Sequence, residues 1–113
     1  MNSPSKLLMI LVDETDTRGD LPLYEAICRK LVKIGTPGAT VQAGIMGFGR
    51  QQHIHRKRLF GVSDDRPISI AIVDSEQHLR DVIIPAIRPM VEDGIMFLMD
   101  AEVIPPLPKK ELE

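Results

Sequence analysis

The amino-acid sequence predicts an α+β fold whose elements follow the order strand, helix, strand, strand, helix, strand. Two observations support this order: apolar runs typical of strands recur along the chain, and two segments between them space their apolar residues as helices do. The chain has 113 residues, of which 43% are hydrophobic and 27% are charged, as expected for one domain. We therefore expect a single domain over residues 6–104, with terminal tails at 1–5 and 105–113.

The first part of the chain is expected to hold one strand and one helix. Lys6–Val12 is a continuous apolar run, which is typical of a central strand covered on both faces. The helix is predicted to have Asp20 as its N-cap and Pro22 in its first turn. Gly35 is expected to end it as a left-handed C-terminal glycine.

Two further strands are predicted on either side of a long polar connection. Ala39–Met46 alternates loosely in polarity, and Gly44 within it indicates a bulge or a close approach of backbones. Gly47–Asp65 is the connection. Pro67 opens the next strand, in which the isoleucines are predicted to share one face: Ile68, Ile70 and Ile72.

A second helix and a last strand complete the order. Asp74 and Gln77 resemble a capping box at the start of the helix. Because Pro85 lacks a backbone donor, we expect a kink or a break near Ile84. Ile95–Ile104 is predicted to be the last strand.

This order predicts the ferredoxin-like βαββαβ topology. Two right-handed crossovers place both helices on one face of a four-stranded antiparallel sheet. Several strands are apolar on both sides, so the face of the sheet away from the helices is expected to pack against another apolar surface. With Cys28 as the one cysteine, no intrachain disulfide can stabilise so small a domain. We therefore expect a homotrimer built around the open sheet face.

Composition and charge argue against several classes of protein. The formal net charge is −2, so no general attraction to nucleic acid is expected. The first apolar run is too short and wrongly flanked for a secretory signal or a membrane span, so no direct membrane insertion is expected. A single thiol suits a reducing compartment, and we expect a cytoplasmic protein. No nucleophile–base pair or paired acids can be assembled, which predicts a protein without catalytic activity.

A glycine-bracketed motif opens the long connection. It consists of five consecutive residues, Gly47, Phe48, Gly49, Arg50 and Gln51. The glycines allow backbone N–H groups to approach a phosphate or a ring, and Arg50 offers a fork suited to phosphate. Ordinary turn glycines at a strand end are the alternative reading of the same residues.

This motif resembles the opening of the mobile loop in the PII signalling proteins. The segment Gly35–Val41 is similar to their turn into the second strand, and Asp93–Phe97 is similar to the turn that closes their nucleotide site. The resemblance covers Lys6–Ile104. Two further features, the Leu-Tyr-Glu-Ala-Ile segment at Leu23–Ile27 and the Ile-His pair at Ile54 and His55, resemble more closely a family of small PII-like proteins, the domain of unknown function family 190.

The resemblance implies a regulatory protein that binds a nucleotide between subunits. Thr40 and Gly47–Gln51 of one chain and Gly94 of its neighbour would line the site. PII proteins hold a triphosphate with a lysine where this chain has Ile95, and with arginines where it has Pro105–Pro108. These departures favour a smaller adenine nucleotide, AMP or ADP, or no nucleotide at all, rather than a triphosphate.

The same connection is expected to face a partner. It carries a basic set without acidic neighbours between Gly47 and Ser63, and the set consists of His53, His55, Arg56, Lys57 and Arg58. The resemblance implies that the 49–65 loop contacts a membrane transporter, a channel or an enzyme. A plain solvated surface is the alternative for this set. His53 and His55 would lie on one side of a strand, but the flanking cations oppose a divalent metal.

Four other classes of protein share this topology and are alternatives to a PII-like protein. An acylphosphatase-like enzyme needs a basic phosphate loop after the first strand, where this chain has Asp13–Asp16. An RNA-recognition domain needs stacking aromatic residues on its middle strands, and aromatic content is 4%. A metal-transport domain needs a Cys-x-x-Cys loop. A trimeric divalent-cation-tolerance protein shares the architecture and remains the alternative function.

Overall fold

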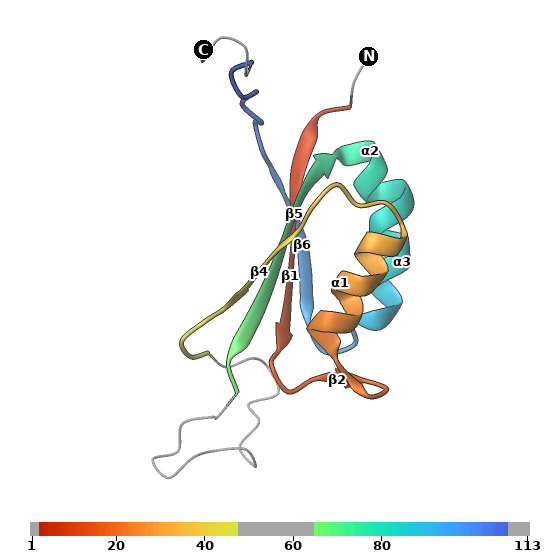
Figure 1. The fold of residues 1–113 in the computed structure, drawn as a ribbon, viewed down its shortest axis with the longest axis vertical. Coiled ribbons are helices and arrows are strands. Elements are labelled where there is room, and N and C mark those ends of the chain that lie inside the picture. Colours follow the sequence, from red (N-terminus) through yellow and green to blue (C-terminus); the bar gives the residue numbers. More distant parts are fainter. Residues whose placement is uncertain (1–2, 48–64, 109–113) are drawn as a thin grey trace.

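The computed structural model describes residues 3–47 and 65–108, which form one sheet with helices on one side (Figure 1). The strands of the sheet are β1 (Ser5–Asp13), β4 (Thr40–Ala43), β5 (Pro67–Ser75) and β6 (Ile95–Asp100). Their order is β4-β5-β1-β6, and every neighbouring pair is antiparallel. The predicted α+β, ferredoxin-like topology is confirmed.

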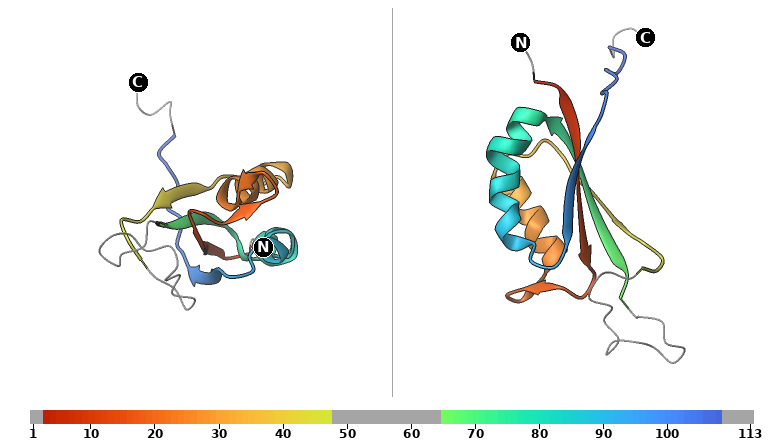
Figure 2. Two further views of the ribbon diagram at one scale, coloured as in Figure 1. Left: turned by 90° about the horizontal axis from the view of Figure 1, so that it is seen from below. Right: turned by 180° about the vertical axis from the view of Figure 1, so that it is seen from behind.

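The core lies between the sheet and the helices, as the side and end views show (Figure 2). Residues directly opposite in antiparallel strands share a face, so the pairs of β1 and β5 build one apolar layer. The predicted isoleucine face of β5 is confirmed. Twelve buried apolar residues make up the core: Leu8, Ile10, Val12, Leu23, Ile27, Leu31, Ile68, Ile70, Ile72, Leu79, Ile83 and Ile87.

The first helix, α1 (Leu23–Lys33), begins later than the sequence predicts. Pro22 occupies the N-cap with extended dihedral angles, φ −56° and ψ 141°. The residues before the helix form a small ladder between β2 (Thr17–Arg18) and β3 (Leu21–Pro22). The prediction that Asp20 caps the helix is therefore wrong, because the chain is still extended two residues after it.

The end of α1 is a glycine-terminated turn, as predicted. Gly35 has φ 83°, and its N–H donates to the carbonyl of Val32 over 3.2 Å. The next N–H, of Thr36, donates to the carbonyl of Leu31 over 3.0 Å. These two bonds form a Schellman motif, which satisfies carbonyl groups that the helix leaves open.

Strand β4 is shorter than the predicted Ala39–Met46, although the close approach predicted at Gly44 is confirmed. The N–H of Gly44 donates to the carbonyl of Pro67 over 2.7 Å. A Cβ at Gly44 would lie 2.7 Å from Cγ of Pro67. Since β5 begins at Pro67, which has no N–H to donate, the ladder between the two strands ends there.

The second helical segment is continuous but irregular. It consists of α2 (Glu76–His78), the π-helical turn η2 (Leu79–Ile83), α3 (Ile84–Ile87) and the 3₁₀ turn η3 (Arg88–Met90). The predicted disturbance near Ile84 takes the form of the π turn that ends directly before it. Pro85 removes one backbone donor here, and a wider turn accommodates that loss without breaking the helix.

The N-cap of this helix is Ser75, one residue later than predicted. Oγ of Ser75 accepts a hydrogen bond from the N–H of His78 over 3.1 Å. Asp74 does not cap the helix: its Oδ1 accepts from the N–H of Ser75, and its Oδ2 lies 2.5 Å from Nδ1 of His78. The predicted capping box of Asp74 with Gln77 is therefore wrong, because Asp74 is still the penultimate residue of β5.

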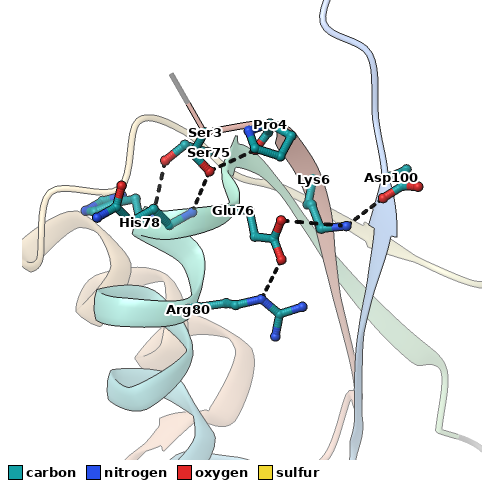
Figure 3. A network of polar contacts seen from close by, with 9 residues as sticks. Ser3, Pro4, Lys6, Ser75, Glu76, His78, Arg80 and Asp100 are labelled. Carbon is teal, nitrogen blue, oxygen red and sulfur yellow. Dashed lines mark hydrogen bonds and ion pairs between the residues drawn. The ribbon is translucent and has the colours of Figure 1, made fainter. Parts of the chain in front are cut away.

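The start of the chain completes this cap (Figure 3). The N–H of Glu76 donates to the carbonyl of Pro4 over 2.7 Å, and the N–H of Gln77 donates to Oγ of Ser3 over 3.0 Å. The first N–H groups of a helix have no partner within it. Residues 3–4 supply those partners from the far end of the sequence.

Charged side chains tie the same end of the sheet together (Figure 3). Nζ of Lys6 lies 2.6 Å from Oδ1 of Asp100 and 3.9 Å from Oε1 of Glu76. The other carboxylate oxygen of Glu76, Oε2, accepts from Nε of Arg80 over 2.7 Å. The hydrogen bond raises the pKa of Lys6 and lowers the pKa of Asp100. Because Asp100 is exposed, these pairs orient the strand ends more than they stabilise the fold.

The face of the sheet away from the helices is apolar, and no described element of the chain packs on it. We call it the open face, and eight apolar residues define it: Leu7, Met9, Leu11, Ala71, Val73, Ile95, Phe97 and Met99. Phe97, midway along the edge strand β6, is 39% exposed. The apolar second face predicted from the sequence is confirmed.

Strand β6 ends at Asp100, earlier than the predicted Ile104. The N–H of Ala101 makes a last, long bond of 3.4 Å to the carbonyl of Ser5, where β1 begins. Within the described residues, no strand lies beside the chain after this point. The apolar residues of 95–104 do not show where β1 begins, and the start of β1 determines where its pairing with β6 ends.

The cap of the second helix can be tested by substitution. We predict that Ser75→Ala lowers the free energy of unfolding by about 1 kcal/mol, because the N–H of His78 loses its acceptor. Urea denaturation at one fixed protein concentration measures the change. Asp20→Ala is the matched control and should change stability little, since Asp20 is exposed and caps no helix. The reverse order of effects would contradict this account.

Candidate functional site

The structure describes three of the predicted nucleotide-site residues. Thr40 is exposed at the start of β4, opposite Ala71 of β5. Gly47 is exposed after the end of β4, and Gly94 directly precedes β6. The remaining predicted residues lie outside the described residues: Phe48, Gly49, Arg50 and Gln51 of the motif, and His53, His55, Arg56, Lys57 and Arg58 of the basic set.

Gly47 is held against the start of β5. A Cβ at this position would lie 3.1 Å from Cγ of Pro67, the residue that also packs on Gly44. A glycine here lets the backbone pass close to the proline ring. The chain therefore enters the 48–64 segment along the first residue of β5.

Gly94 is required by packing against the central strand. A Cβ there would lie 2.4 Å from the carbonyl oxygen of Leu11 and 2.7 Å from Cγ1 of Val91. Real Cβ atoms do not approach a backbone oxygen so closely, so a side chain would displace β6 from β1. This requirement exists within one chain and without any ligand.

The predicted residues occupy opposite edges of one sheet. Thr40 and Gly47 belong to the β4 edge, whereas Gly94 belongs to the β6 edge, and β5 and β1 lie between them. Three strand spacings amount to about 14 Å. A single chain therefore does not bring Thr40 and Gly94 together.

An ion pair joins the start of β5 to the end of β1, beside the β4 edge. Nε and Nη2 of Arg66 donate to the carboxylate of Glu14 over 3.1 and 2.7 Å. The N–H of Glu14 also donates to the carbonyl of Arg66 over 2.9 Å. The Arg66 side chain lowers the pKa of Glu14, and the Glu14 carboxylate raises the pKa of Arg66. The positive charge of Arg66 is thus already compensated.

Sequence reasoning did not single out this pair. The signal was available in the pairing of the strands, because Asp13 lies opposite Pro67 in the antiparallel ladder. The residues one step beyond each, Glu14 and Arg66, must then face one another. Their charges are opposite, which favours the contact.

The described part of the chain contains neither a cluster of potential metal ligands nor a helix that could cross a membrane. No group of three or more histidine, cysteine, aspartate or glutamate residues there could hold a metal ion. No helix in residues 3–47 and 65–108 has the length and hydropathy needed to cross a membrane. His53 and His55 lie outside these ranges.

Comparison with known proteins identifies the family. The sequence pattern of DUF190, described as "Uncharacterized ACR", matches residues 5–103. The chain belongs to the DUF190 family. A "UPF0166 protein" from Aquifex aeolicus is 29% identical to this DUF190 chain over 99 residues, which cover 88% of the chain and 92% of the relative. A "UPF0166 protein" from Methanocaldococcus jannaschii is 30% identical over 100 residues, covering 88% and 91%.

Solved structures with a similar fold are PII-like proteins. CPII from Thiomonas intermedia K12, bound to ADP, AMP and acetate, superposes with a TM-score of 0.63 at 21% identity and covers 94% of both chains. The same protein bound to ADP, AMP and bicarbonate gives 0.62 at 19% identity, covering 95% of this chain and 100% of CPII. Arabidopsis thaliana PII bound to citrate gives 0.59 at 18%, covering 88% and 78%. The resemblance inferred from the motif is confirmed for family and fold.

The role of Gly94 in packing can be tested directly. We predict that Gly94→Ala lowers the free energy of unfolding by about 1–3 kcal/mol, because the added methyl group meets the Leu11 carbonyl. Gly38→Ala is the matched control: no atom lies within 4 Å of the added Cβ, and its φ is not positive. Chemical denaturation of both variants measures the difference. Equal stability of the two would overturn the packing argument.

Proposed function

We propose that this DUF190 chain is a PII-like regulatory protein of the cytoplasm, without catalytic activity, that works as a homotrimer. It binds AMP or ADP between subunits and presents its 49–65 segment to a transporter, a channel or an enzyme. One observation carries the proposal: the residues of the predicted nucleotide site lie on opposite edges of a sheet whose second face is apolar and uncovered.

The open face supports the assembly. It extends over β5, β1 and β6, and its exposed members include Val73 at 44%, Phe97 at 39% and Met99 at 50%. A contiguous apolar surface of this kind favours association, and a second copy carries the same surface. A closed assembly covers it on every subunit, whereas an open one would leave apolar surface at its ends.

Closure of the ring also supports a shared site. The β4 edge with Thr40 and Gly47 and the β6 edge with Gly94 are separated within one chain. Around a rotation axis, the β4 edge of one subunit faces the β6 edge of the next. In the proposed trimer the two halves of the site therefore come from neighbouring chains. The similar fold of CPII holds ADP and AMP.

The charges near the site favour a ligand with few phosphates. Arg66 is paired with Glu14, so it offers little attraction to an additional anion. Ile95 and Pro105–Pro108 supply no cation where PII proteins grip a triphosphate. Each lost charge-assisted contact forfeits roughly 1.5–3 kcal/mol, and a monophosphate does not use those contacts. Arg50 is then the main anchor for the ligand.

The assembly can be measured by light scattering. We expect three times the chain mass of 12.6 kDa at micromolar concentration. Phe97→Gln should shift the mass toward the monomer, because a polar group then replaces an exposed aromatic side chain of the open face. Val82→Gln is a matched control, since Val82 has nearly the same exposure, 38%, on the helical side. A monomeric wild-type chain would exclude the proposal.

The ligand can be identified by calorimetry with AMP, ADP and ATP side by side. We expect AMP or ADP to bind more tightly than ATP. Arg50→Ala should weaken binding about tenfold or more while the trimer persists, and Arg88→Ala on the helical segment should leave binding unchanged. Tightest binding of ATP would refute the reading of the missing cations. Binding of divalent cations, with no nucleotide bound at millimolar concentration, would favour the divalent-cation-tolerance alternative.

A further inference from the structure

The segment that follows β6 is exposed and apolar. It runs away from the sheet beyond Asp100 (Figure 1). Three of its large apolar side chains are strongly exposed: Val103 at 55%, Ile104 at 81% and Leu107 at 75%. Residues 103–108 carry no charge. We call these six residues the C-terminal arm.

The prolines of the arm determine how it can make contacts. Pro105, Pro106 and Pro108 have no N–H, so the arm cannot continue β6 as a regular hydrogen-bonded strand. Their fixed φ angles also stiffen the segment. A stiff segment loses less conformational entropy when it becomes ordered on a surface. The arm is therefore suited to contact through its apolar side chains.

An apolar row of the open face lies at the end of the sheet where the arm begins. Leu7 of β1 is opposite Val73 of β5 and Met99 of β6, so the three side chains form one row across the sheet. Val73 is 44% exposed and Met99 is 50% exposed. The next pair on the same face beyond this row is polar, with Ser5 of β1 opposite Ser75 of β5.

We propose that the C-terminal arm packs Ile104 and Leu107 onto the row of Leu7, Val73 and Met99 in a second copy of this chain. The inference rests on the proposed homotrimer. In a ring whose axis runs along the strands, equivalent ends of the sheets lie together, so the arm of one subunit starts beside the row of the next. A second copy is the occupant because each copy carries both the uncharged arm and an uncovered apolar row at the same end.

This contact gives the arm a role in holding subunits together. Val73 and Met99 of the row, and Ile104 and Leu107 of the arm, are exposed in a single chain. Their burial adds apolar area to the interface without adding a ladder hydrogen bond. The trimer would therefore be closed by the open face at its centre and by three arms at one end.

Dilution of the trimer tests the proposal. The double variant Ile104→Gln/Leu107→Gln should raise the concentration at which half of the trimer dissociates by at least about tenfold. Val32→Gln is the matched control, because Val32 is 79% exposed on α1, away from the open face. Sedimentation equilibrium measures the dissociation, and circular dichroism verifies that all chains are folded.

The outcomes separate this inference from the proposed function. A trimeric wild type with a weakened double variant and an unchanged control supports the arm. A trimeric wild type whose double variant dissociates at the same concentration overturns the arm and leaves the proposed assembly standing. A monomeric wild type overturns both.

Crosslinking provides a second test that does not depend on affinity. A photoreactive label is placed at Leu107→Cys in a Cys28→Ser background, and equal amounts of isotopically heavy and light chains are mixed. Crosslinks from the label to strands β1, β5 or β6 should join a heavy chain to a light one. Crosslinks confined to single chains would overturn the proposed contact.

Discussion

The structure depends on the alternation of side chains between the two faces of its central strand, β1. Successive side chains of a strand point to opposite faces, and β1 is apolar at every position from Leu7 to Val12. One set, Leu8, Ile10 and Val12, is buried under the helices. The other set, Leu7, Met9 and Leu11, lies on the open face. A strand of this composition needs an apolar layer on each face, and the described residues 3–47 and 65–108 supply one of the two.

Much of the fold follows from local patterns in the sequence, whereas its limits depend on contacts between distant segments. The left-handed Gly35, the buried face of β5 and the apolar open face could be predicted because each depends on residue type and spacing. The end of β6 could not, because it is set by where β1 begins. The start of α1 was missed for a different reason: the ladder of Thr17–Arg18 with Leu21–Pro22 is local, but its two residue pairs are too few to give a strand pattern in the sequence.

Two glycines of the candidate site can be explained by packing within one chain. Gly47 and Gly94 were selected by their resemblance to a nucleotide site, yet both are glycines for reasons that one chain already provides. Gly47 passes the ring of Pro67, and Gly94 passes the carbonyl of Leu11. A glycine at such positions is therefore compatible with a ligand without being evidence for one. The pair of Glu14 and Arg66 became visible only when the register of β1 and β5 was known.

The capping of the second helix by Ser3 and Pro4 has a consequence for the order in which the chain can fold. The N–H groups of Glu76 and Gln77 find their acceptors more than seventy residues earlier in the sequence. Helical turns usually close as local events, and distant pairings are slow because a long loop must first be brought together. The first turn of this helix cannot be fully bonded until β1 has docked beside β5. Completion of the first turn of this helix therefore depends on the pairing of β1 with β5.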